Sequence, residues 1–162
     1  MHKKLIIRKS AFEGIRDDME YLQVILDKYN TLWEAEPENF MENFNENQIT
    51  LLFYGILYNQ VHNGGFLQLI FNGYAPYIFC EPLIDGLKEW GAVSTAKLIK
   101  SISDKCLQVA DKMDKTSLEN LSKSYTQYPE FKNYDNDFYK NNGLKEVKKY
   151  VSLHINDFIT VE

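Results

Sequence analysis

The chain contains little cysteine and, in its centre, no charge. Two cysteines among 162 residues cannot form a disulfide framework or a four-cysteine zinc site. Residues 47–80 carry no charged side chain, but their longest nearly apolar run, 49–58, is about half the length of a bilayer span of about 20 residues. The apolar stretch at 5–7 is too short for a signal peptide. We therefore expect no membrane partner and a cytoplasmic location.

The overall composition favours one folded domain. Hydrophobic residues make up 44% and aromatic residues 14%, which is too much for a disordered chain. The length suits a single domain over residues 1–162. A formal net charge of −5 disfavours a broad basic surface for direct nucleic-acid binding.

The charge is distributed unevenly. Residues 1–12 carry four positive and no negative side chains, residues 13–46 have a local net of −8, and residues 81–162 have a net of −1. Residues 1–9 thus form a basic N-terminal segment, and residues 34–45 an acidic connector. Either the acids are a solvated helix face with an acidic loop, or they form a surface for a basic partner. We name ten of them the acidic patch: Glu13, Asp17, Asp18, Glu20, Asp27, Glu34, Glu36, Glu38, Glu42 and Glu46.

Helical signals recur along the chain, and strand signals do not. Apolar side chains three or four residues apart, as in 12–29 and 94–112, predict amphipathic helices. Three pairs have the spacing of helix N-terminal capping boxes: Ser10 with Glu13, Asn45 with Gln48, and Thr116 with Glu119. We predict an all-α fold, a single compact domain of about seven or eight helices, with room for a short extended piece at 4–7.

The stretch 58–74 contains a double glycine between two helical segments. Asn63 and the glycines are typical of a helix end, so we predict a central helix pair kinked at Gly64-Gly65. Amides recur on both sides of the kink at helical spacing. They either brace the helix pair or line a polar pocket that binds a ligand. The candidate pocket residues are Gln60, His62, Asn63, Gly64, Gly65, Gln68 and Asn72.

No residue pattern predicts a reaction. Amides are neutral and cannot act as general bases. No two histidines have metal-ligand spacing, and Cys80 and Cys106 lack the setting of a nucleophile. No phosphate-binding loop or nucleophile elbow is present. We therefore predict no catalytic residue, cofactor or metal, and expect a protein that is not an enzyme.

The double-glycine stretch carries a resemblance to a known family. Gln60-x-x-Asn63-Gly64-Gly65-Phe66-x-Gln68-x-x-x-Asn72, together with Tyr134-Asp135-x-Asp137-Phe138-Tyr139 further on, is similar to the pattern of the DNA mimic protein 19 family of bacterial helical proteins. The family usually has Glu where this chain has Gln60. The resemblance implies an all-helical fold, an acidic surface that imitates DNA phosphates and binds a transcription factor, and a dimeric state.

Three functions remain open at this point. The first is a non-enzymatic interaction protein whose acidic patch binds a basic protein surface, such as that of a DNA-binding protein, and which forms a homo-oligomer. The second is a small-molecule-binding or hydrolytic domain that uses the amides around the double glycine. The third is a plain oligomeric scaffold in which the uncharged block forms the subunit interface.

Overall fold

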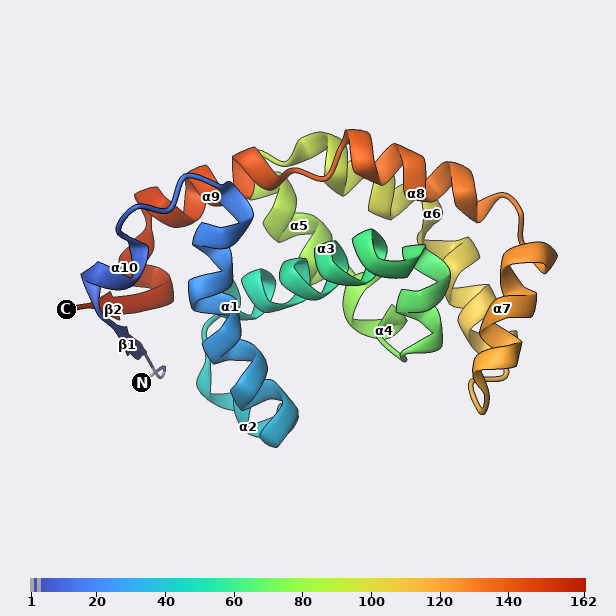
Figure 1. Ribbon diagram of the computed structural model, residues 1–162, viewed down its shortest axis with the longest axis horizontal. Coiled ribbons are helices and arrows are strands. Elements are labelled where there is room, and N and C mark those ends of the chain that lie inside the picture. The colour runs from blue at the N-terminus through green and yellow to red at the C-terminus, as the bar shows by residue number, and fades with distance from the viewer. Residues whose placement is uncertain (1, 3) are drawn as a thin grey trace. The chain divides into compact units, whose positions relative to one another are not determined.

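The computed structural model describes residue 2 and residues 4–162, and its chain divides into two compact units. Unit 1 comprises residues 1–55 and 144–162, and unit 2 comprises residues 56–143. The all-α prediction is confirmed: the described residues form ten α-helices, one 3-10 helix and two three-residue strands (Figure 1). Of the basic N-terminal segment, Met1 and Lys3 lie outside the described residues.

Unit 1 brings the two ends of the chain together. Strands β1 and β2 form a parallel pair in which Leu5 lies opposite Ile159, and this pair accounts for the extended piece expected at 4–7. The elements of unit 1 are β1 (Leu5–Ile7), η1 (Lys9–Phe12), α1 (Asp18–Ala35), α2 (Pro37–Asn43), the first part of α3 (Glu46–Phe71), α9 (Leu144–Leu153), α10 (Ile155–Phe158) and β2 (Ile159–Val161).

The core of unit 1 is built around α1. Its buried face carries Leu22, Leu26 and Tyr29 at the spacing of an amphipathic helix. The carbonyl oxygen of Phe158 accepts hydrogen bonds from the Tyr29 hydroxyl at 2.7 Å and from the Gln48 amide at 2.9 Å. Because the buried Tyr29 hydroxyl and Gln48 amide are hydrogen-bonded, their burial costs little folding free energy.

Unit 2 contains the rest of α3 together with α4 (Ala75–Ile78), α5 (Glu81–Glu89), α6 (Val93–Lys112), α7 (Leu118–Gln127) and α8 (Phe131–Lys140). Its core combines aliphatic side chains with five buried aromatic ones. The ring of Phe66 packs against the rings of Phe79 and Phe138, with centroids 6.1 and 5.8 Å apart. The Cys106 side chain is fully buried, and burial raises the pKa of its thiol. It is therefore a packing residue in an unreactive state.

Of two predicted helix caps, the structure confirms one and contradicts the other. Asn45 and Gln48 form the predicted reciprocal pair, because each backbone N–H donates to the other's side-chain oxygen at 2.8 or 2.9 Å. The prediction at Ser10 is wrong: α1 begins at Asp18, and the Asp17 carboxylate accepts from the Glu20 N–H at 2.9 Å. Both sites match the capping spacing, and only the structure distinguishes them.

The structure has more helices than the seven or eight expected from the sequence. The additional ones are short: α2 has seven residues, while α4 and α10 have four each. Helices of one or two turns are too short to show an apolar stripe that repeats. The acidic connector expected at 34–45 therefore contains a helix, which Pro37 begins rather than prevents.

Candidate functional site

The double glycine lies at a sharp bend in α3, which confirms the predicted kink. Gly65 has φ +81° and ψ −179°, a conformation adopted almost only by glycine. Side chains also crowd both glycines. A Cβ atom at Gly64 would overlap the Gln68 amide, and one at Gly65 would overlap the Asp135 carboxylate. The backbone therefore requires glycine at Gly65, and a side chain at either position would displace the end of a neighbouring polar side chain.

Asp135 of α8 caps the helical turn that follows the bend. Its Oδ1 accepts a hydrogen bond from the Phe66 N–H at 2.8 Å. In an unbroken helix this N–H would bond to the carbonyl four residues earlier, and the bend removes that partner. The carboxylate thus acts as an N-cap side chain supplied by another helix. Burial raises the pKa of Asp135, while the bond from Phe66 opposes that shift.

Two tyrosine hydroxyls bind the carbonyls on the other side of the bend. Tyr125 of α7 donates to the Gly64 oxygen, and Tyr139 of α8 donates to the Val61 oxygen at 3.1 Å. Burial raises the pKa of both tyrosines, and the charge of Asp135 adds to the effect. Helices α7 and α8 therefore supply hydrogen bonds to backbone carbonyls at the bend of α3.

The four predicted amides contact one another across the bend. Asn63 Nδ2 donates to Gln68 Oε1 at 3.2 Å, and Gln68 Nε2 donates to Gln60 Oε1 at 3.1 Å. Asn72 Nδ2 donates to the same Gln60 oxygen at 2.8 Å. These contacts join the two arms of α3, which supports the bracing interpretation of the amides.

His62 takes part in a different set of contacts from those of the amides. Its exposed ring stacks on the ring of Tyr58, with centroids 4.1 Å apart, and tilts against Tyr139 at 5.1 Å. Burial of part of the ring lowers the pKa of His62. Of the seven candidate pocket residues, His62 is thus held by ring packing, while the amides and glycines belong to the hydrogen-bonded bend.

Sequence reasoning did not connect Asp135, Tyr125 and Tyr139 with the double glycine. Asp135 is 69 residues away from Phe66 along the chain, and no periodicity reports such a contact. A signal did exist, because the motif Tyr134-Asp135-x-Asp137-Phe138-Tyr139 carries two of the three residues. The structure shows that this motif and the double-glycine motif meet in one set of contacts.

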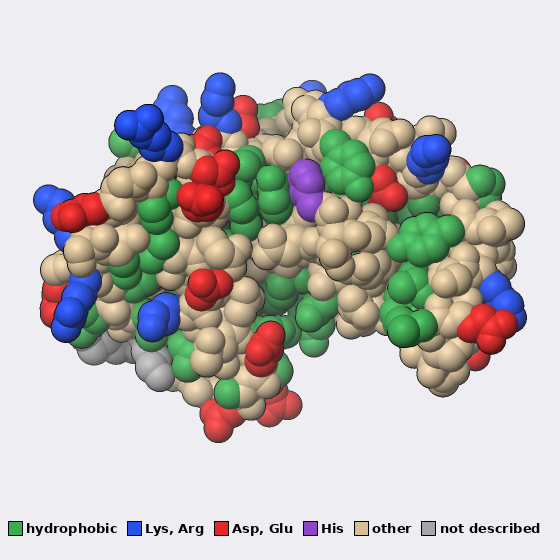
Figure 2. All heavy atoms as spheres, viewed as in Figure 1, with side chains coloured by type: hydrophobic (Ala, Val, Ile, Leu, Met, Phe, Trp, Pro, Cys, Tyr) green, Lys and Arg blue, Asp and Glu red, His purple; other side chains and the backbone are tan. Residues whose placement is uncertain are grey.

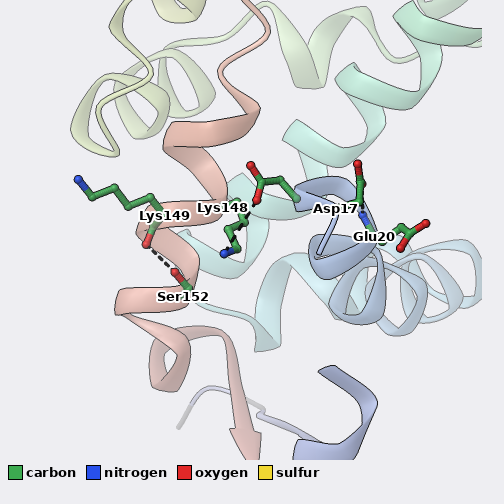
Figure 3. Close-up of polar contacts among 6 residues, drawn as sticks. Asp17, Glu20, Lys148, Lys149 and Ser152 are labelled. Carbon is green, nitrogen blue, oxygen red and sulfur yellow. Dashed lines mark hydrogen bonds and ion pairs between the residues drawn. The ribbon is translucent and has the colours of Figure 1, made fainter. Parts of the chain in front are cut away.

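All ten residues of the acidic patch belong to unit 1, and nine of them are exposed. Figure 2 shows acidic side chains along α1 and down to α2. The exception is Asp18, a half-buried residue at the start of α1 whose carboxylate lies 3.9 Å from the Lys148 ammonium. Figure 3 shows Lys148 on α9 close to this end of α1. With Asp17 capping α1, the first part of the patch is used structurally.

The second half of the patch lacks such partners. Within the part of the chain that the structure describes, no Lys or Arg forms an ion pair with its five carboxylates, all of which are exposed. The sequence has no Lys or Arg between Lys28 and Lys88, so this stretch of chain contributes only negative charge. We call these five residues the α2 acidic cluster: Glu34, Glu36, Glu38, Glu42 and Glu46.

The described residues contain no group of three His, Cys, Asp or Glu side chains arranged to hold a metal ion. No helix within the described ranges combines the length and the hydropathy needed to span a bilayer. At the bend the polar groups are paired, and at the α2 acidic cluster they face solvent. The two regions thus differ in the chemistry that they offer to another molecule.

Comparisons with known proteins cover the bend but only a small part of the acidic patch. Residues 42–157 match the DMP19-like protein family. Over 102 residues the chain is 34% identical to the DNA mimic protein DMP19 of Neisseria meningitidis serogroup B, and 59% of each protein is covered. The chain thus spans about three fifths of that relative's length. The bend and its amides lie inside the family match, whereas most of the acidic patch precedes residue 42. Because the match covers most of the chain, this protein belongs to the DMP19-like family.

Proposed function

We propose that this protein is a non-enzymatic interaction protein, which binds the basic surface of a DNA-binding protein through its acidic patch. The proposal draws on the family membership and on a relative whose name describes a DNA mimic. A DNA-binding protein presents Lys and Arg to the phosphates of the duplex. A surface of carboxylates offers the same sign of charge to that site.

The observation that carries the proposal is the α2 acidic cluster. Five exposed carboxylates lie within thirteen residues, in a stretch of sequence without any Lys or Arg. Unit 1 contains thirteen acidic and nine basic side chains, a net of −4, whereas unit 2 contains ten and nine, a net of −1. Since complementary charge steers association and selects partners, a basic partner is expected to approach unit 1.

The spacing of the acids limits how much DNA the patch can imitate. Glu20, Asp27 and Glu34 follow one face of α1 seven residues apart, so successive carboxylates are separated by about 10 Å along the helix. Duplex DNA carries one charge per about 1.7 Å of its axis. We therefore propose that the patch covers part of a DNA-binding surface, and that a homodimer, as the family resemblance implies, supplies a second copy of the patch.

The test is affinity capture from a bacterial lysate with three forms of the full chain. The test variant replaces Glu34, Glu36, Glu38 and Glu42 by Gln. The matched control replaces four exposed acids of unit 2, Glu81, Asp85, Glu89 and Asp111, by Gln or Asn, and so changes the net charge equally. We expect a DNA-binding protein to be captured by the wild type and the control, and lost with the test variant.

Two further measurements make the capture specific. The captured protein should leave the wild-type chain as NaCl rises from 50 to 300 mM, because the screening length of exposed charges falls from about 14 Å to about 6 Å over this range. Adding the wild-type chain should also displace that protein from its DNA in a gel-shift assay. A partner that survives high salt, or that the test variant still captures, would contradict the proposal.

A further inference from the structure

Helix α7 is packed more weakly than the other long helices of unit 2. Of its ten residues only Ser124 is buried, whereas α6 buries six. Leu118, an apolar residue at its start, is 74% exposed. A ten-residue helix is marginal on its own and normally depends on an apolar face packed against the protein. The face that α7 turns toward the end of α6 is instead polar.

A pocket of about 260 Å³ lies between this face and the C-terminal end of α6. On α7 its residues recur at helical spacing and include Asn120, Lys123 and Gln127. The end of α6 and the loop after it add Lys112, Met113 and Asp114 to the wall, and Ser124 and Tyr128 complete it. The volume is slightly below that of typical small-molecule sites, which run from about 300 Å³ upward, and so suits a small ligand.

The wall of the pocket offers more donors than acceptors. The Lys112 ammonium forms no ion pair within the described chain. Lys123 pairs only with the highly exposed Glu119, at 3.0 Å and four residues away, a type of pair that water and salt weaken. The one carboxylate, Asp114, already accepts hydrogen bonds at Oδ1 from the Thr116 N–H and hydroxyl, at 3.0 and 2.6 Å. The Asn120 side chain also bonds to Asp114, and Gln127 Nε2 donates to the Tyr128 hydroxyl at 3.3 Å. The two ammonium groups therefore remain for a ligand.

We propose that this pocket binds a small organic anion, with a carboxylate or phosphate group facing Lys112 and Lys123. The side chains of Met113 and Tyr128 provide an apolar surface for the body of the ligand. The bound ligand adds the contacts that α7 lacks. The site is on unit 2, away from the acidic patch of unit 1 in the sequence, and does not depend on the proposed function.

The test is an NMR titration of the ¹⁵N-labelled full chain with phenyl phosphate, benzoate and the neutral benzyl alcohol. The two anions separate phosphate from carboxylate recognition, and the alcohol reports what the ring binds alone. We expect saturable shifts of α7 amide signals with at least one anion, and at least tenfold weaker binding of benzyl alcohol. Binding should also raise the melting temperature, since the ligand binds only the folded state.

Variants locate the site on the chain. Lys112→Gln and Lys123→Gln should each weaken anion binding by about tenfold, the effect of one lost charge contact in a partly exposed site. The control Lys100→Gln removes an exposed lysine of α6 outside the pocket and should leave binding unchanged. Circular dichroism verifies that each variant is folded. Absence of saturable shifts, equal binding of benzyl alcohol, or equal losses in all three variants would overturn the proposal.

Discussion

The α2 acidic cluster and the bend at Gly65 use their polar groups in opposite ways. At the bend, the Phe66 N–H, the Val61 and Gly64 carbonyls and the side-chain amides bond to partners within unit 2. In the cluster, five carboxylates of unit 1 face solvent without an ion pair in the described chain. Polar groups that are satisfied internally stabilise a fold, whereas unpaired surface charges remain available to other molecules.

The family match reinforces this contrast. The bend and Asp135 lie within residues 42–157, but only Glu42 and Glu46 of the acidic patch do. The family match therefore includes the bend, whereas eight of the ten acids of the patch lie before residue 42. The comparison predicts that changes at the bend alter stability and that changes in the cluster alter binding.

The largest expected effect is that of Gly65→Ala. An alanine at φ +81° is strained, and its Cβ atom would overlap the Asp135 carboxylate, so that either the carboxylate moves away from Phe66 or the bend changes. We expect the free energy of unfolding to fall by about 3 kcal/mol or more, measured by urea denaturation.

Gly73→Ala is the control for Gly65→Ala, because Gly73 has a similar φ of +84° but open space around its Cβ position. We expect it to cost about 1 kcal/mol, the strain of a positive φ alone. Equal losses in the two variants would mean that the overlap with Asp135 adds nothing to the cost of backbone strain at Gly65.

The next effect is the loss of the cap on Phe66. Asp135→Ala leaves that N–H without its acceptor, which we expect to cost about 1–3 kcal/mol of folding stability. Asp135→Asn keeps a side-chain oxygen at the same position and should recover most of the loss. Thermal or urea unfolding of the pair measures the difference. A similar loss in both variants would show that the carboxylate charge matters more than the hydrogen bond.

The same residue gives a smaller, pH-dependent effect. Burial raises the pKa of Asp135 in the folded chain above its unfolded value, so protonation favours the folded state. Its contribution is fully present below the unfolded pKa and is lost as pH rises through the folded pKa. The stability of the wild type relative to Asp135→Asn should therefore increase as pH falls from 7 to 3. A difference that is constant with pH would contradict the raised pKa.

The sequence predicted the local features of the bend better than its long-range contacts. The glycine pair predicts the kink, and the amides at helical spacing predict a shared helix face. Both features depend only on residues close together in the sequence. The cap from Asp135 and the tyrosine hydroxyls come from α7 and α8, and nothing in helical periodicity indicates which helices pack together. The contacts that complete the bend therefore required the structure.

For the acidic patch, the sequence predicted where the acidic residues lie along the chain but not which of them have partners within the fold. Charge counts located ten acids in 13–46, and exposure bears out nine of them as surface residues. Only the structure shows that Asp17 caps α1 and that Asp18 lies near Lys148. These roles follow from where α1 begins and from the contact of α9 with α1. The wrong cap prediction at Ser10 shows that sequence spacing alone does not locate the start of α1.

The smallest effect on stability is expected in the α2 acidic cluster. Glu38 and Glu42 are four residues apart on α2, so they repel each other, while Glu38 in the first turn also favours the helix dipole. Because these terms oppose each other, replacing both by Gln should change the free energy of unfolding by less than about 0.5 kcal/mol in urea at low and at high salt. A loss above about 1 kcal/mol would mean that the carboxylates have structural partners. If the stability of this double variant is unchanged, any loss of partner capture that it shows must come from the removed charges and not from a damaged fold.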